Sequence, residues 1–285
     1  MKKIIPLLLI FSLFFTVNVF AENENKTDYE EFYSVCLNYN GADDSKKAAE
    51  FKEQYNEAVK CFFEDKDYKK AYKLFKNIIK KDSDKQRVTN SKAVLFEMYL
   101  KGLYVGKDYD KAFSLGKEII KENDSSYPLY PKVLVTIGEM AFTYTGSDME
   151  FDEGVSLIKL AASLGNEEAL KILAKIKAEG VTKDNLGEKI YGLKDLILFP
   201  KRENKIMRTV NLIEVMHVFL PNVVVAGMGY MPDGELVLFI GNPDDKFHER
   251  QNIRILPGKK IRQVGTFKLK LENGVTKDIP AVVIK

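Results

Sequence analysis

Apolar residues recur at helical spacing between about residues 28 and 182, and at strand spacing from about residue 190 onward. In the first part, hydrophobic side chains return every three or four positions, as in helices that bury one face. In the second part, short β-branched runs alternate with turn residues, which is typical of strands. The change of period predicts an α+β protein with a helical domain over residues 28–182 and a β-rich domain over residues 190–285. The polar segment 183–189 is interpreted as a linker.

A short phrase of sequence returns three times within the helical part. Lys66-Asp67-Tyr68-Lys69-Lys70-Ala71 is repeated as Lys107-Asp108-Tyr109-Asp110-Lys111-Ala112, and more loosely at residues 150–154. Tyr68, Tyr109 and Phe151 follow one another at intervals of 41 and 42 residues. A fixed period in this range predicts an α-solenoid, a stack of helical hairpins in which neighbours cover one another's apolar faces. Such stacks mostly bind other proteins.

These residues also resemble a known family. The run from Tyr99 to Gly102, followed after a short connection by Lys107 to Ala112, is similar to the sel-one-like repeat. This repeat is a longer-looped relative of the tetratricopeptide repeat. The run from Lys159 to Ala169 resembles the join between two such repeats. The resemblance covers about residues 50–180.

The resemblance implies a solenoid of TPR-like hairpins in which small residues let the helices approach closely. It therefore implies packing roles for Ala71, Ala112, Ala161 and Ala162. Two residues, Phe96 and Tyr104, stand where the family usually has glycine. Because the repeat pattern gives Tyr104 no packing role, we expect its side chain to belong to a binding surface.

The β-rich part is organised by hydrophobic runs and turn motifs. The runs are Leu196–Phe199, Val223–Val225, Leu236–Ile240 and Ala281–Ile284. The turns Pro232-Asp233-Gly234 and Asn273-Gly274 lie between such runs, and Asn-Gly is a strong hairpin motif. These features predict a small antiparallel β-sheet or barrel. They resemble no family.

The beginning of the chain predicts export. Two lysines precede an apolar stretch from Ile4 to Val19, and small residues at Val19 and Ala21 match a signal-peptidase site. These 16 residues fall short of the roughly 20 that span a bilayer as a helix. We expect residues 1–21 to be a removed signal peptide. The mature protein is then periplasmic, with secretion as an alternative, and it does not span the membrane.

Export gives the two cysteines a possible role. Cys36 and Cys61 lie in adjacent expected helices, and an oxidising compartment allows them to pair. A disulfide bond between them is the first interpretation, and two buried free thiols are the alternative. Neither has a histidine nearby in the sequence, which argues against a catalytic cysteine.

Charge is divided between the two halves. Residues 22–189 carry a net charge of −4, and residues 190–285 carry +5. Opposite signs are compatible with docking of the halves or with separate partners, but two ordinary solvated surfaces are the preferred explanation. The most basic stretch is a candidate binding surface together with Tyr104. It contains Arg250, Arg254, Lys259, Lys260 and Arg262.

The sequence contains few indications of catalysis. His217 lies in an apolar run and is interpreted as a strand or core residue, whereas His248 lies in a polar loop. The chain has no HExxH motif, no zinc-type cysteine pair and no Asp-rich calcium loop. We therefore expect no catalytic residue, no metal and no cofactor, and we expect that the protein is not an enzyme.

Three functions fit these observations. The first is a periplasmic adaptor or scaffold that holds a protein partner in the repeat groove. The second is an immunity protein that neutralises an exported toxin. The third is an envelope hydrolase or carbohydrate-active protein with its site in the β-rich domain. The expected partner is a protein of the bacterial envelope, with an anionic envelope polymer as an alternative and no nucleic acid.

Overall fold

The computed structural model describes residues 26–38, 46–142, 147–207, 210–228, 235–242, 244–271 and 273–285. Side chains are described within these ranges except at residues 26–29, 46, 47 and 202. The expected signal peptide, residues 1–21, lies outside them. Among the described residues, no helix is both long enough and apolar enough to cross a membrane.

The chain forms two compact units, and each is described by itself. One unit holds residues 141–155 and 173–285, and the other holds the described residues up to 140 together with 156–172. The division does not fall at the polar segment 183–189, where we expected the linker.

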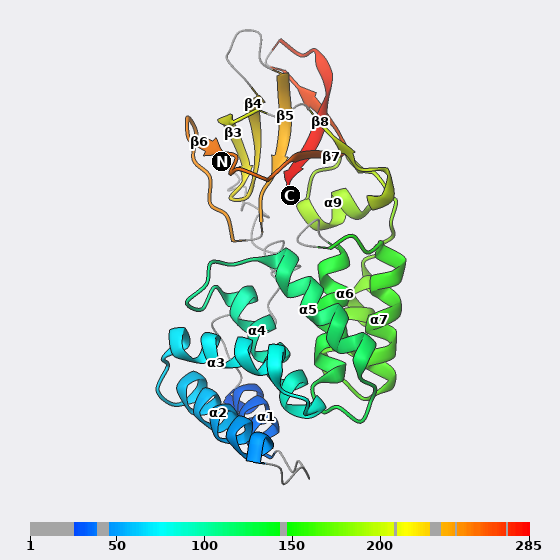
Figure 1. The fold of residues 1–285 in the computed structure, drawn as a ribbon. Coiled ribbons are helices and arrows are strands. Elements are labelled where there is room, and N and C mark those ends of the chain that lie inside the picture. Colours follow the sequence, from blue (N-terminus) through cyan, green and yellow to red (C-terminus); the bar gives the residue numbers. More distant parts are fainter. Residues whose placement is uncertain are drawn as a thin grey trace, which may run out of the picture. The chain divides into compact units, whose positions relative to one another are not determined.

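The first part of the chain is helical, as its period predicts (Figure 1). Its helices are α1 (Lys26–Leu37), α2 (Lys46–Phe63), α3 (Tyr68–Lys81), α4 (Lys85–Lys101), α5 (Tyr109–Glu122), α6 (Tyr130–Phe142), α7 (Phe151–Ser163) and α8 (Glu167–Ala178). Consecutive helices pack together, α2 against α3, α3 against α4 and α4 against α5.

The repeated phrase marks the beginnings of three of these helices. Asp67 precedes α3 and accepts a hydrogen bond from the backbone N–H of Lys70, and Asp108 precedes α5 and accepts one from Lys111. The third copy begins α7, where the Glu153 carboxylate accepts the backbone N–H of Glu150. Each copy satisfies backbone donors that a helix start leaves open.

Small residues lie where helices approach one another. Ala71, Ala112 and Ala161 are fully buried, whereas Ala162 is only partly buried. Gly116 of α5 has a similar role, because a Cβ atom there would lie 2.8 Å from Cγ1 of Ile137 on α6. The α4–α5 contact also carries charge, since Lys92 of α4 pairs with Glu118 and Glu122 of α5.

The last part of the chain forms one mixed sheet. Its strands are β1 (Leu196–Leu198), β2 (Lys205–Ile206), β3 (Leu212–Leu220), β4 (Val223–Met228), β5 (Glu235–Ile240), β6 (Asn252–Arg254), β7 (Ile261–Lys270) and β8 (Thr276–Ile284). The strand order is β1-β7-β8-β5-β4-β3-β6, with β2 paired to β7.

The expected sheet is confirmed, but it is not wholly antiparallel. The described pairs are antiparallel except for β5 and β8, which run parallel. The Asn273-Gly274 turn joins β7 to β8 in a hairpin, with Gly274 at a φ of 80°. The hairpin makes β8 antiparallel to β7, and the other edge of β8 pairs with β5. Among the described strands, no pairing joins β1 to β6, so the ladder stays open and does not form a closed barrel.

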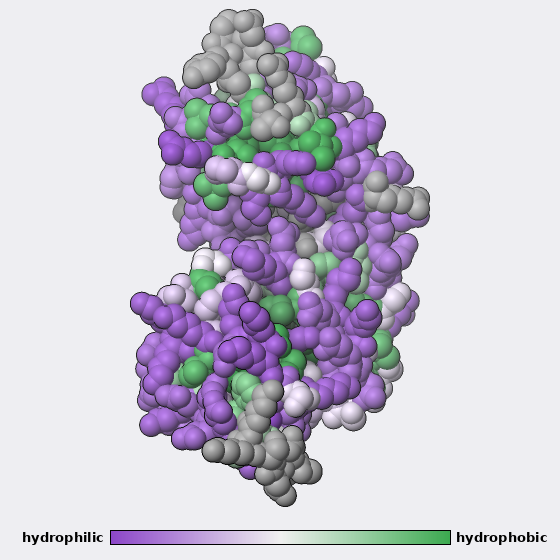
Figure 2. All heavy atoms as spheres, viewed as in Figure 1, coloured by the Kyte–Doolittle hydropathy of each residue, from purple (hydrophilic) through white to green (hydrophobic). Residues whose placement is uncertain are grey.

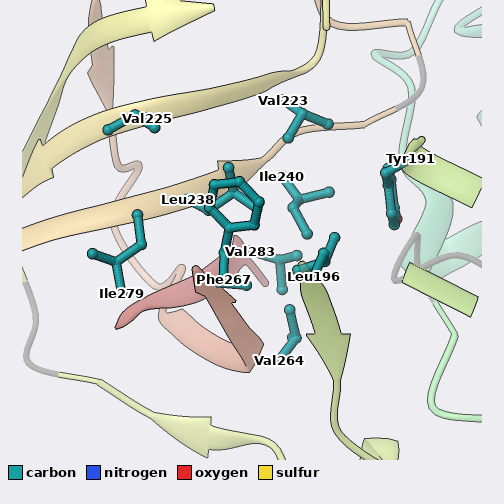
Figure 3. Close-up of a cluster of buried hydrophobic side chains, with 11 residues drawn as sticks. Tyr191, Leu196, Val223, Val225, Leu238, Ile240, Val264, Phe267, Ile279 and Val283 are labelled. Atoms are coloured by element: carbon teal, nitrogen blue, oxygen red, sulfur yellow. The ribbon is translucent and has the colours of Figure 1, made fainter. Parts of the chain in front are cut away.

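Both faces of the sheet are buried. Val223, Val225, Leu238 and Ile240 lie in one cluster, together with Phe267 and residues from outside the central strands (Figure 3). Their neighbours in sequence, Val224 and Phe239 among them, belong to a second cluster on the opposite face. This explains why these strands are continuous hydrophobic runs rather than alternating ones.

The segment 183–189 is not an extended linker, because it enters helix α9 (Leu186–Tyr191), which packs against β1. Tyr191 and Leu196 belong to the same buried cluster. Gly187 allows the close approach, since a Cβ atom there would lie 3.0 Å from Cγ of Leu196. Gly187 therefore has a packing role in this segment.

Candidate functional site

Tyr104 lies on the surface of the connection between α4 and α5. Its side chain is 50% exposed, and its ring packs against Tyr72 of α3 with centroids 5.7 Å apart. The Tyr72 hydroxyl shares a 2.8 Å hydrogen bond with the Tyr99 hydroxyl. Two cations lie over these rings, Lys76 over Tyr72 and Lys111 over Tyr99. We call these five residues the tyrosine surface.

The backbone at Tyr104 has the conformation that favours glycine. Its φ is 63°, in the left-handed region, two residues after Gly102 ends α4 with a φ of 75°. A tyrosine in this region costs free energy that glycine would not. Such strain is found where the side chain has a role that outweighs it. The left-handed backbone accounts for the glycine that the repeat pattern predicts at this position. It does not account for the tyrosine side chain.

Other large hydrophobic side chains are also exposed on the described chain. Hydrophilic side chains cover most of the face drawn in Figure 2, and hydrophobic residues reach it in smaller groups. Large exposed hydrophobic side chains in the described chain also include Leu37, Ile197, Leu256 and Val275. Those residues occur on different elements, whereas the Tyr104 ring contacts that of Tyr72, which in turn meets that of Tyr99 edge to face.

A second feature of the helical unit is the position of α1. This helix packs against both α2 and α4. Phe32 of α1 is buried and its ring lies 5.3 Å from that of Phe63 at the end of α2. Tyr33 also packs on Phe63 and donates a hydrogen bond to the Glu64 carboxylate. The face that α2 and α4 present to α1 is therefore covered, and we call it the α1 seat.

The end of α1 is held by polar side chains. The Tyr55 hydroxyl of α2 donates a 3.0 Å hydrogen bond to the backbone oxygen of Cys36. Asn90 of α4 donates from Nδ2 to the Val35 oxygen at 3.3 Å and to the Tyr55 oxygen at 3.0 Å. Carbonyls in the last turn of a helix have no partner within the helix. Here the α1 seat supplies those partners.

The two cysteines are free in this structure and both are buried, so the expected disulfide bond is not formed. Cys36 lies beside Tyr55, which is six residues from Cys61 on the same helix. Burial raises the pKa of the Cys36 thiol to about 12, which keeps it uncharged.

The basic residues that we expected to form one surface lie at several places. Arg250 has a φ of 63° and its N–H binds the Val215 oxygen, so it belongs to the edge near β3. Arg254 lies on β6, and Arg262 lies on β7, at the other side of the strand order. Lys260 exchanges two backbone hydrogen bonds with Lys285. Lys259 precedes it in the same exposed connection.

The two histidines have different partners. His217 is on strand β3 as expected, but it is exposed, and its Nδ1 lies 3.5 Å from a Glu249 oxygen. The backbone N–H of His248 donates to Gln251, while the Asp245 carboxylate accepts the N–H of Asn242. No group of three or more metal-binding side chains occurs among the residues that the structure describes.

A pocket in the sheet unit was not expected from the sequence. Its volume is about 370 Å³, and Lys201 lies in its wall. Charged and apolar side chains from distant positions line it, namely Glu150, Phe151, Asp152, Lys183, Asp184, Leu186, Leu198, Phe199 and Pro200. Lys201 donates from Nζ to the Ala141 oxygen at 2.7 Å, and its N–H donates to the Glu150 carboxylate.

The environment of Lys201 disfavours the charged form of its amine. Burial and the nearby charge of Lys285 lower the pKa of the Lys201 amine to about 7, against the opposing effect of Glu150 and other carboxylates. No motif could have revealed this pocket, because its charged residues are spread over about fifty positions. The sequence shows only that Lys201 follows a hydrophobic run and a proline.

Comparison with known proteins does not assign the chain to a class. No family model matches it, and neither the curated proteins nor the solved structures contain a match. The function must therefore be argued from the geometry described above.

Proposed function

We propose that this protein is an exported bacterial interaction protein that binds a protein partner through its helical unit. The proposal includes the sel-one-like, TPR-like solenoid that the repeated phrase and its small residues indicate. It also includes removal of residues 1–21 and a periplasmic location. The tyrosine surface is the proposed contact with the partner.

The main support is the strained backbone at Tyr104. Tyrosine is among the residues that contribute most to protein interfaces, because its large ring is apolar and its hydroxyl can bond. Tyr104 exposes half of such a ring in a conformation that would be more favourable with glycine. The Tyr72 ring packs against it, and Lys76 lies over the Tyr72 ring. A partner with an acidic rim and an apolar centre fits this surface.

The concave groove of the repeats is another location for the partner. We predicted that a partner lies in this groove, and α1 contacts both α2 and α4. The basic residues of the sheet unit are a weaker candidate, because they occur on separate strands and an exposed connection. The tyrosine surface therefore comes first in the proposal.

The test compares three forms of the purified protein as bait in envelope extract. Wild type and Leu256→Ala, an exposed substitution in the sheet unit, are expected to capture the same partner. Tyr104→Gly is expected to lose it, since glycine keeps the backbone and removes the ring. Equal capture by all three forms would exclude the tyrosine surface. Capture of one toxin enzyme would favour the immunity function, and capture of several envelope components would favour the adaptor.

A further inference from the structure

Helix α1 packs against the rest of the helical unit in the way that a bound helical peptide packs against its receptor. Its buried anchor is Phe32, which is 5% exposed and lines a cavity of about 20 Å³. The other walls come from α4 and from the start of α6 with the segment before it, through Ala93, Phe96, Leu129 and Val133. One aromatic side chain of α1 thus reaches several helices of the unit. Helix-in-groove recognition uses anchors of this kind.

The α1 seat also recognises the end of a helix. Tyr55 and Asn90 donate to the backbone oxygens of Cys36 and Val35. These bonds involve only the backbone of α1, so any helix that ends at this point can form them. The side-chain contribution comes from Phe32 and from Tyr33, which packs on Phe63 and donates to Glu64.

Few side chains hold α1 in place. Within residues 30–38, only Phe32 and Cys36 are buried, and Leu37 is 52% exposed. A segment with few buried apolar contacts is among the first to open locally. From the side chains described in α1, we therefore expect its detachment to cost less than unfolding of α2 to α5.

The seat has hydrogen-bonding capacity that α1 does not use. Among the described residues, the buried Tyr127 hydroxyl and the Asn90 carbonyl oxygen have no hydrogen-bond partner. The Tyr127 hydroxyl is close enough to Cys36 for the two groups to interact electrostatically. A thiol is a weak partner for the Tyr127 hydroxyl, whereas an amide or hydroxyl side chain at the position of Cys36 can bond to it more strongly. Buried polar groups without partners cost stability, so a ligand that satisfied them would bind more tightly.

We infer that α1 is a self-ligand, and that the α1 seat accepts a helix of a partner protein in its place. The partner helix carries an aromatic residue at the position of Phe32. It carries an amide or hydroxyl side chain at the position of Cys36, and it ends where Tyr55 and Asn90 bind its last carbonyls. The inference rests on the proposed function only in assigning the helix to another protein. Helix binding itself is independent of the tyrosine surface.

The test uses fluorescent peptides and the full chain. One peptide has the sequence of residues 26–38, a second carries Cys36→Asn, and a third carries Phe32→Ala. The receptor is Phe32→Ala protein, whose own α1 is weakened, compared with wild type and with Leu37→Ala as a matched control on α1. Circular dichroism and thermal unfolding verify that each variant keeps its fold. Hydrogen exchange of the α1 amides in wild type gives a second measure of its detachment.

Fluorescence anisotropy is expected to show that the first two peptides bind the Phe32→Ala protein at least about tenfold more tightly than wild type or Leu37→Ala. The Cys36→Asn peptide should bind more tightly than the native peptide, and the Phe32→Ala peptide should not bind. Adding Tyr55→Phe to the receptor should weaken binding about tenfold.

Three results would overturn the inference. One is absence of peptide binding to folded Phe32→Ala protein together with α1 amides that exchange only on global unfolding. Another is equal affinity for the native and Cys36→Asn peptides. The third is dimer formation between copies through exchanged α1 helices, which would make a second copy the occupant. Because no partner protein is used, these results are separate from the Tyr104→Gly capture experiment.

Discussion

Tyr104 shows how a single residue departs from a repeat pattern at a structural cost. The pattern expects glycine, and the observed φ of 63° gives the reason. The unusual residue at position 104 could be identified from the sequence, because the repeat pattern predicts glycine where this chain has tyrosine. The support from Tyr72 could not, since the two tyrosines are 32 positions apart and only the fold brings them together.

The strain can be measured directly. Tyr104→Gly is expected to leave the free energy of unfolding unchanged or to raise it by up to about 1 kcal/mol, because relief of the left-handed strain offsets the lost ring contact. Tyr109→Ala is the contrast, since Tyr109 is buried and its loss should cost about 3 kcal/mol through a cavity. Urea unfolding of both variants tests this. A large loss of stability in Tyr104→Gly would show that the ring is mainly structural.

The low pKa of Lys201 predicts how stability depends on pH. Its amine has a pKa of about 7 in the folded protein and an ordinary, higher pKa in the unfolded chain. Between these values the unfolded state binds more protons, so this group makes stability rise with pH from about 7 to about 10.5. Below pH 7 the folded protein bears the full cost of charging the buried amine.

The variant Lys201→Met is expected to lose that rise. The free energy of unfolding of Lys201→Met, relative to that of wild type, should be higher at pH 6 than at pH 9.5. The lost hydrogen bond to Ala141 adds a difference that does not depend on pH. Lys205→Met, an exposed lysine substitution in the same unit, is the control. Chemical unfolding at a series of pH values supplies the measurement. Parallel profiles for wild type and Lys201→Met would mean that the amine is charged and solvated throughout.

At the scale of elements, local patterns predicted what local chemistry determines. Asp67 and Asp108 begin helices because their carboxylates bind backbone N–H groups three residues later. Asn273-Gly274 forms the expected hairpin for a similar reason. Helix α9 was missed because polar residues and Gly187 hide its packing on β1. The parallel pairing of β5 and β8 was missed because alternation within a strand says nothing of its neighbours.

The contact between α5 and α6 gives an element-scale prediction. Gly116→Ala improves helix propensity by about 1 kcal/mol, but the new methyl group would meet the buried Ile137 side chain and approach Phe96. We expect a net loss of about 1–3 kcal/mol because overpacking prevails. Ser114→Ala on the exposed side of α5 is the matched control. An increase in melting temperature for Gly116→Ala would show that α6 moves away at little cost.

At the scale of the whole molecule, the sequence predicted an α+β chain but not its units. Residues 141–155 belong to the same unit as the sheet, although their period is helical. That assignment depends on contacts between distant segments, such as the Lys201 backbone with Glu150, which no local pattern records. The pocket at Lys201 and the α1 seat escaped prediction for the same reason.

The charge difference between the two halves of the sequence remains a prediction about partners. The basic residues of the sheet unit do not lie on one element. This favours ordinary solvated surfaces over a single polymer-binding face. The tyrosine surface and the α1 seat both belong to the helical unit. The account therefore places protein binding there.

Site-specific photo-crosslinking in cells tests this claim most directly. A benzophenone amino acid is placed at position 104 in one strain and at position 259, in the basic connection of the sheet unit, in another. The account predicts one discrete adduct with a partner protein from position 104 and none from position 259. An adduct from position 259 alone would contradict it and would place the binding surface on the sheet unit.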